Sequence, residues 1–168
     1  SGQVTVYFGA TELGQGSDDV LSALTAEALG IDPINIRCVT GDTGITPIDL
    51  GSYSSRVTIM MGNAALQAAG RVRELLASAA AEALNTLPDR VVFSQDRVFA
   101  AEDPGKTMSF IEAVALAETK FGTIAAVGSY APPKPPGKYK GAGVGPAPAD
   151  RFSVCVLVPE VHARTASV

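Results

Sequence analysis

The chain has 168 residues, of which 46% are hydrophobic and 18% are charged, and its formal net charge is −4. This length suits one domain or one lobe of a larger protein, and the apolar content is sufficient for a packed core. The acidic balance, with no basic cluster denser than Lys134, Lys138 and Lys140, argues against a nucleic-acid groove as the main function. No window approaches the ~18 consecutive apolar residues that a membrane span requires.

The first forty residues predict a strand, a glycine loop, a helix and a second strand. Alternating apolar residues at 3–8 predict a strand, and an amphipathic run at 18–29 predicts a helix that packs on a sheet. Gly30 stands where a helix commonly ends, and Pro33 follows as a stop. Residues 35–40 predict a second short strand, so we expect a β-loop-α-β unit.

The glycine loop at residues 9–19 is the centre of the functional prediction. Its three glycines within eight residues permit a sharp turn and close approach of a ligand. Ser17 is the expected N-cap, with Asp18 and Asp19 in the first helical turn. A strand, a glycine loop and a helix N-terminus in this order favour an anion, because unpaired N–H groups and the helix dipole face it.

A second loop ends at a second helix. Residues 41–51 are rich in turn-forming residues, and an alanine-rich helix is expected to run to about residue 84 after Ser54 or Ser55 as its N-cap. Glycines at 62 and 70 within this helix indicate tight packing or a local bend. We expect the two loops to converge on one anionic ligand, with Arg56 adding a fixed positive charge.

The rest of the chain predicts smaller elements. Residues 90–93 and 97–100 predict a hairpin, Ser109 and Glu112 predict a capping box that opens a helix at 110–120, and Gly122 ends it. Further strands are expected at 123–130 and 152–158. We divide the chain into an α+β lobe at 1–130, a Pro/Gly-rich extended segment at 131–149, and a terminal strand with a truncated tail at 150–168. The abrupt ends favour a fragment of a longer polypeptide.

Catalytic and metal-binding patterns are weak. The single histidine, His162, lies near the end of the chain and is more typical of an exposed strand residue than of a Ser/His/Asp triad. Asp18 and Asp19 would more commonly complement the helix dipole than bind a metal. Cys38 and Cys155 stand alone, which excludes a four-cysteine cluster in this chain and fits a reducing, cytoplasmic setting.

Phosphate-loop alternatives fit poorly. Gly9 and Gly14 have the spacing of a P-loop, but Gln15 and Gly16 stand where Lys and Ser/Thr belong. A nucleotide γ-phosphate would therefore lack its counter-charge. The glycines at 141–145 also lack the spacing of a dinucleotide fingerprint, and Pro146 follows where a helix would start.

Three motifs together resemble one family. Residues 9–18, 41–47 and 51–64, in this order and spacing, resemble the C-terminal part of the large subunit of the molybdenum hydroxylase (xanthine oxidase) family. Residues 51–56 and 137–146 look most like its 4-hydroxybenzoyl-CoA reductase branch. The resemblance covers about residues 3–156.

The resemblance implies a cofactor site made of two loops. The cofactor would be a molybdopterin dinucleotide, the cytosine form being the common bacterial one, and its dithiolene would hold molybdenum, so no protein metal ligand is expected. The implied cofactor-binding residues are Gly14, Gln15, Gly16, Ser17 and Asp18 at the pterin and pyrophosphate, and Ser54, Ser55, Arg56, Val57 and Thr58 at the dinucleotide end.

The resemblance also implies what this chain would lack. The family's glutamate base lies in a Gly-Glu-Pro-Pro-like motif that does not occur here, so we expect no catalytic residue and no activity from the chain alone. The whole enzyme would oxidise or reduce a carbon centre of an aldehyde, an N-heterocycle or an aryl-CoA. Its partners would be the rest of the large subunit, together with iron–sulfur and FAD domains or subunits. The alternative is a stand-alone, noncatalytic module that binds a phosphate-bearing ligand.

Overall fold

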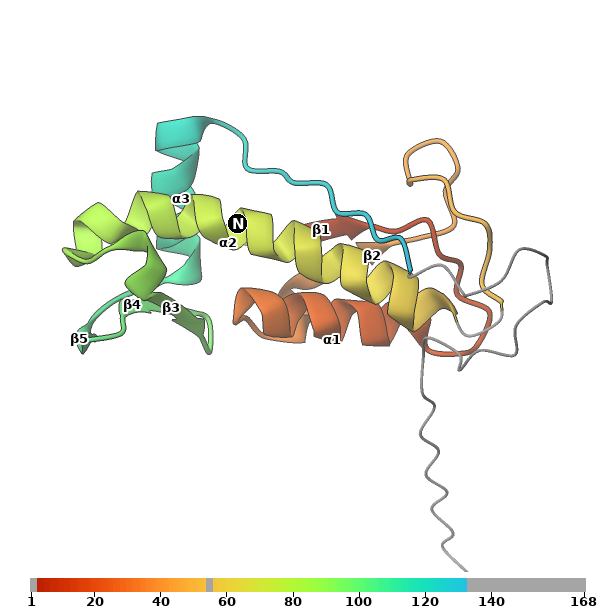
Figure 1. Ribbon diagram of the computed structural model, residues 1–168, viewed down its shortest axis with the longest axis horizontal. Helices are drawn as coiled ribbons and strands as arrows, with labels where there is room; N and C mark the ends of the chain where they lie inside the picture. Colours follow the sequence, from red (N-terminus) through yellow and green to blue (C-terminus); the bar gives the residue numbers. More distant parts are fainter. Residues whose placement is uncertain (1–2, 54–55, 133–168) are drawn as a thin grey trace, which may run out of the picture. The chain divides into compact units, whose positions relative to one another are not determined.

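The computed structural model describes residues 3–53 and 56–132, which belong to one compact unit (Figure 1). The expectations for residues 133–168, including the strand at 152–158, lie outside the described residues. The helices and strands of the described part are β1 (Val4–Tyr7), α1 (Ser17–Leu29), β2 (Ile36–Val39), α2 (Gly62–Leu84), β3 (Val91–Ser94), β4 (Arg97–Ala100), β5 (Asp103–Ser109) and α3 (Phe110–Phe121).

The β-loop-α-β prediction is confirmed. Strand β1 pairs in parallel with β2, and α1 connects them, so the loop after β1 and the start of α1 lie at the same edge of this sheet. Gly30 ends α1 at φ 71°, and its N–H donates to the carbonyls of Ala26 and Glu27. A Cβ at this position would also collide with the Phe93 carbonyl, so glycine is required for two reasons.

Helices α1 and α2 lie side by side and run in the same direction (Figure 1). Leu21 packs with Ala65 near their N-terminal ends, and Arg73 Nη1 donates to the Ala28 carbonyl, at 3.0 Å, near the C-terminal end of α1. Gly62 lies against Leu24, which explains a small residue there, whereas Gly70 has open space around it. The N-termini of both helices therefore point to the same end of the lobe, where the two loops lie.

The second sheet is antiparallel, in the order β3-β4-β5. The predicted hairpin is confirmed, and its two-residue turn places Gln95 and Asp96 at φ 52° and 59°, as a type I′ turn requires. Strand β5 was not predicted, because the sequence around Pro104 and Gly105 is typical of a turn. The capping box of Ser109 and Glu112 at the start of α3 is confirmed.

One predicted strand is wrong. Residues 123–130 form no strand and instead extend along α2 (Figure 1). Side chains of α2 bind this segment: Gln67 Oε1 accepts from the Ser129 N–H at 3.0 Å, and Arg71 donates to the Val127 carbonyl. Gly128 packs directly on the α2 backbone, where a Cβ would collide with the Ala64 carbonyl. The hydrogen bonds of this segment are thus made with side chains of α2 and not with a neighbouring strand.

The α+β class is confirmed, with the strands divided between two small sheets. The larger apolar core joins the C-terminal half of α2 to the antiparallel sheet and α3, and its side chains include Leu76, Leu84, Phe93, Val98 and Phe110. A smaller core lies near the loops and consists of Phe8, Ala10, Leu21 and Ala65. None of the helices in the described part is long and apolar enough to cross a membrane.

Candidate functional site

The glycine loop turns sharply into α1. Gly14 and Gly16 adopt φ 98° and 74°, and a Cβ built on either would have nothing within 4 Å, so the space around both positions is open. Gly16 is the N-cap of α1, so the prediction that Ser17 is the N-cap is wrong. Ser17 is the first helical residue and is buried, because its hydroxyl is engaged inside the loop.

The carboxylate of Glu12 occupies the N-terminus of α1. Its Oε1 accepts from the N–H groups of Gly14 at 2.6 Å and Gly16 at 3.1 Å. Its Oε2 accepts from the Asp18 N–H at 3.2 Å and from the Ser17 hydroxyl at 3.1 Å. These bonds, above all the one from Asp18, lower the pKa of Glu12 from 4.5 to about 2. The anion that the sequence predicts at this helix end is thus already supplied by the chain.

Sequence reasoning missed Glu12. Glu12 comes before the helix, whereas the glutamate of a capping box lies in the first turn of its helix. The known capping pattern therefore does not predict its role. The available signal was a lone carboxylate in a loop whose N–H groups needed an acceptor.

Gln15 braces the same loop with its side chain. Its Oε1 accepts from the Leu13 N–H at 2.6 Å, and its Nε2 donates to the Thr11 carbonyl at 3.0 Å and to the Ser17 hydroxyl at 2.9 Å. Its own backbone N–H makes no hydrogen bond to any described residue. Gln15 is an exposed residue, so a ligand could approach this part of the loop.

Asp18 links α1 to the end of β2. Its Oδ2 accepts from the Thr40 hydroxyl at 3.2 Å, while its Oδ1 is buried and has no partner within the described ranges. Cys38 lies in the same region, and burial, followed by the negative charge of Asp18, raises the pKa of its thiol to about 11. A thiol with this pKa is protonated at neutral pH and is a poor nucleophile.

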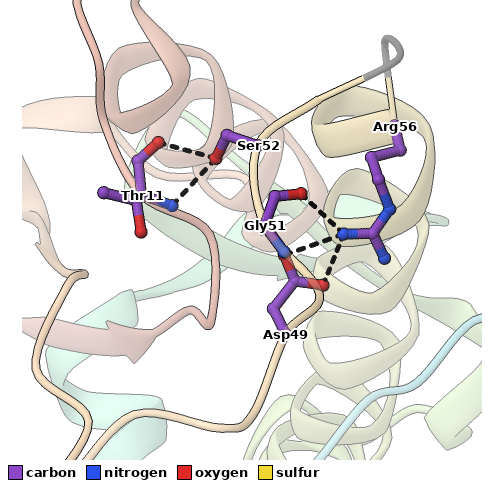
Figure 2. Close-up of polar contacts among 5 residues, drawn as sticks. All are labelled: Thr11, Asp49, Gly51, Ser52 and Arg56. Atoms are coloured by element: carbon purple, nitrogen blue, oxygen red, sulfur yellow. Dashed lines mark hydrogen bonds and ion pairs between the residues drawn. The ribbon is translucent and has the colours of Figure 1, made fainter.

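The second loop is held by an ion pair (Figure 2). Arg56 Nη1 donates to both Asp49 oxygens, at 2.8 and 3.0 Å, and to the Gly51 carbonyl at 2.7 Å. The Arg56 side chain is 15% exposed and the Asp49 side chain 4%, so the pair is largely desolvated. Burial opposes ionisation of Asp49, but the hydrogen bond from Arg56 and those from backbone N–H groups outweigh it and lower its pKa below 3.8.

The Arg56 guanidinium is engaged on one side only by the described residues. The guanidinium also lies 5.4 Å from the centroid of the Tyr53 ring, which adds a cation–π contact. All its hydrogen bonds to described residues use Nη1, so the donors on Nη2 and Nε are not engaged by that part of the chain. The predicted fixed charge is present, but Asp49 balances it.

The structure brings the two loops together. The Ser52 hydroxyl donates to the Thr11 carbonyl at 2.7 Å and accepts from the Thr11 N–H at 3.1 Å (Figure 2). Gly9 lies so close to Pro47 and Asp49 that a Cβ would collide with them. Neither Ser52 nor Thr11 was among the predicted site residues, because a contact between distant loops leaves no local pattern in the sequence.

The remaining predicted residues start the second helix. Val57 and Thr58 lie in a π-helical turn, Val57–Met61, that leads into α2, and such turns are frequent at functional sites. Val57 packs on the smaller core, whereas Thr58 is exposed. Ser54 and Ser55, with the predicted N-cap, lie outside the described residues. Both loops also expose large apolar side chains: Leu13, Ile45, Ile48, Leu50 and Tyr53.

Comparison with known proteins places these loops in a familiar context. The family model of the molybdopterin cofactor-binding domain matches residues 1–168. The 6-hydroxypseudooxynicotine dehydrogenase complex subunit gamma of Paenarthrobacter nicotinovorans is 44% identical over 89 residues, which are 53% of this chain and 11% of that protein. The xanthine dehydrogenase molybdenum-binding subunit of Escherichia coli O157:H7 is 30% identical over 116 residues, which are 68% of this chain and 15% of that protein.

Two solved structures have a fold similar to that of this chain. Quinoline 2-oxidoreductase from Pseudomonas putida 86 aligns with a TM-score of 0.68 and 26% identity over 77% of this chain and 17% of its own. CO dehydrogenase from Oligotropha carboxidovorans aligns with a TM-score of 0.65 and 28% identity over 74% of this chain and 16% of its own. The chain thus spans 11% to 17% of the length of these four proteins.

Proposed function

Because the chain belongs to the molybdopterin cofactor-binding domain family, we propose that its two joined loops hold the pterin and the pyrophosphate–nucleotide part of a molybdopterin dinucleotide. The observation that carries this proposal is the junction of the loops by Ser52 and Thr11 at the end where α1 and α2 both begin. A ligand spanning both loops would contact the glycine loop at the start of α1 and the loop that leads into α2.

The described residues fit such a group. Gly14 and Gly16 leave open space for close approach, and the N–H of Gln15, which no described residue accepts, could donate to the pterin. The buried Oδ1 of Asp18 has no partner in the described part of the chain and can accept one hydrogen bond from an N–H group. Arg56 can offer the outer donors of its guanidinium to a phosphate while Nη1 holds the loop.

The proposed roles follow this division. Gly14, Gln15, Gly16, Ser17 and Asp18 would form the wall at the pterin, and Ser54, Ser55, Arg56, Val57 and Thr58 the wall at the dinucleotide end. When bound, the cofactor would supply molybdenum for two-electron oxidation or reduction at carbon. This chain would bind and orient it, and the glutamate base would come from another part of the polypeptide. The chain alone would be inactive.

The finer assignments rest on the resemblance of the motifs. We propose the cytosine form of the dinucleotide, and the 4-hydroxybenzoyl-CoA reductase branch on residues 51–56. The relatives are named for 6-hydroxypseudooxynicotine, xanthine, quinoline and CO, and xanthine and quinoline are N-heterocycles, so this class competes with aryl-CoA. Aldehydes are a further class that only the motif resemblance suggests.

The proposed partners are the rest of the large subunit, with iron–sulfur and flavin domains or subunits, in the cytoplasm. The exposed apolar side chains of the loops, Ile48 and Leu50 among them, favour burial against the rest of the subunit. A stand-alone phosphate-binding module is less well supported, because Glu12 already occupies the N-terminus of α1.

The test is the cofactor content of the full-length enzyme with Gln15→Ala and Arg56→Ala combined. We expect most of the molybdenum and of the released nucleotide to be lost, because both walls are damaged. The matched control, Gln3→Ala with Arg37→Ala, changes the same residue types at exposed positions on the β1–β2 side. Full molybdenum and nucleotide content in the Gln15/Arg56 variant would contradict the proposal.

A further inference from the structure

We propose that Glu12 is the positioning residue of the cofactor loop: its carboxylate is a built-in anion that holds residues 14–18 in their binding shape and keeps ligand phosphates off the N-terminus of α1. This inference rests on the proposed function and assigns a role to a residue outside the predicted site. It makes α1 and α2 unequal, because only the second helix start would be open to an anion.

The geometry is that of an internal ligand. Four donors converge on one carboxylate, and they come from four of the five residues at positions 14–18: Gly14, Gly16, Ser17 and Asp18. The fifth, Gln15, is the one whose backbone N–H is left free by the described residues. A single acceptor therefore organises the loop around the donor that the cofactor would use.

Glu12 also controls the Gln15 side chain indirectly. The Ser17 hydroxyl donates its only hydrogen to Glu12, so its lone pairs are left to accept from Gln15 Nε2. Without the carboxylate, the hydroxyl could rotate and release the amide. The orientation of Gln15 thus depends on a residue that need not touch the cofactor.

Charge separates the two helix starts. At α1, Glu12 is joined by Asp18 and Asp19 in the first turn, so a phosphate there would meet three carboxylates. The turn Val57–Met61 and the start of α2 carry no acidic residue in their first turns. Arg56 immediately precedes them; Asp49 balances its charge, but its Nη2 and Nε donors are not engaged by the described residues. The phosphates are therefore expected on the Arg56 side and the uncharged pterin on the Gly14 side.

The experiment compares Glu12→Ala and Glu12→Gln in the full-length enzyme, with Glu112→Gln as a matched control at the start of α3. We expect roughly tenfold weaker retention of cofactor in the Ala and Gln variants, comparable to the loss of other residues that orient a binding group. The control variant should retain the wild-type molybdenum and nucleotide content, because Glu112 caps another helix.

A second measurement uses the cofactor-free enzyme and tests the internal anion directly. Acetate should raise the thermal midpoint of Glu12→Ala by filling the emptied cradle, whereas acetamide should not, and neither should affect the wild type. If Glu12→Ala does not fold, the Gln variant gives the pH profile. Wild-type stability should fall as pH drops from 4.5 toward 2, because the folded pKa is the lower one, and Glu12→Gln should flatten this fall.

Unchanged cofactor content in Glu12→Gln, no response of Glu12→Ala to acetate, or an unchanged acid profile would each overturn the inference. These results are distinguishable from failure of the proposed function. If the proposed function fails, the Gln15/Arg56 variant would keep its cofactor, while the response of Glu12→Ala to acetate would persist.

Discussion

A glutamate carboxylate accepts hydrogen bonds from backbone N–H groups at the N-termini of both α1 and α3, but the two glutamates lie at different places in the sequence relative to their helices. At α3, the Ser109 hydroxyl accepts from the Glu112 N–H at 3.2 Å, and Glu112 accepts from the Ser109 N–H at 2.7 Å. At α1, Glu12 reaches forward over a loop that contains two left-handed glycines. The first arrangement only starts a helix, whereas the second also shapes a loop in which one backbone donor remains free.

The two helix starts also differ in what surrounds them: apolar side chains at α3 and polar contacts at α1. Phe110 at the start of α3 is buried in the larger core, together with Leu76 of α2. The loops beside α1 rest on the smaller core and are connected mainly by polar contacts, such as those of Ser52 and Arg56. Apolar burial therefore stabilises the α3 end, and directional hydrogen bonds define the loop end. Variants at the two ends should separate stability from cofactor binding.

The largest expected effect is on stability at the α3 end. Leu76→Ala empties a fully buried position and should lower the free energy of unfolding by about 2–5 kcal/mol. Urea denaturation measures it, with Leu66→Ala, 44% exposed on the same helix, as the matched control. The folded fraction should keep its cofactor content. Selective loss of cofactor in Leu76→Ala would break the proposed separation.

The next effect is at the loop end. Asp49→Ala leaves the largely buried Arg56 without its partner and should cost about 3 kcal/mol in free energy of unfolding, together with loss of cofactor. Asp89→Ala, at an exposed position, is the control and should change little. Denaturation and molybdenum analysis on the same samples test both parts. If Asp49→Ala lowered the free energy of unfolding less than Asp89→Ala does, the ion pair would not hold this loop.

A smaller pair of effects compares the two serines directly. Ser109→Ala removes the N-cap of α3 and should cost about 1 kcal/mol without changing cofactor content. Ser17→Ala removes a buried hydroxyl that joins Glu12 to Gln15, so cofactor content should fall as well. Thermal unfolding with cofactor analysis separates the two variants. Equal cofactor content in both would mean that the two helix starts are functionally alike.

The smallest effect is a gain. Gly70→Ala should stabilise the protein by up to about 1 kcal/mol, because a Cβ there meets nothing within 4 Å and alanine favours a helix. Gly62→Ala should gain less, because the new methyl group must displace the Leu24 side chain between α1 and α2. Paired denaturation curves measure the difference. A larger gain at Gly62 would show that the contact between the helices is loose.

Local patterns predicted much of this fold. The capping box of α3, the end of α1 at Gly30 and the β3–β4 hairpin were all predictable, because each depends on hydrogen bonds between residues near in sequence. The strand expected at residues 123–130 was not correctly predicted. Its apolar pattern suits a strand, but the segment hydrogen-bonds to side chains of α2 instead.

The candidate site divides in the same way. The sequence by itself determined two glycine-containing loops, each leading into a helix, because glycine content, turn residues and helix periodicity are local properties. Only the tertiary structure decided what those loops hold. Glu12 at the N-terminus of α1, Asp49 on Arg56 and Ser52 on Thr11 are choices of partner, and a partner is set by which atoms the fold brings within hydrogen-bonding distance.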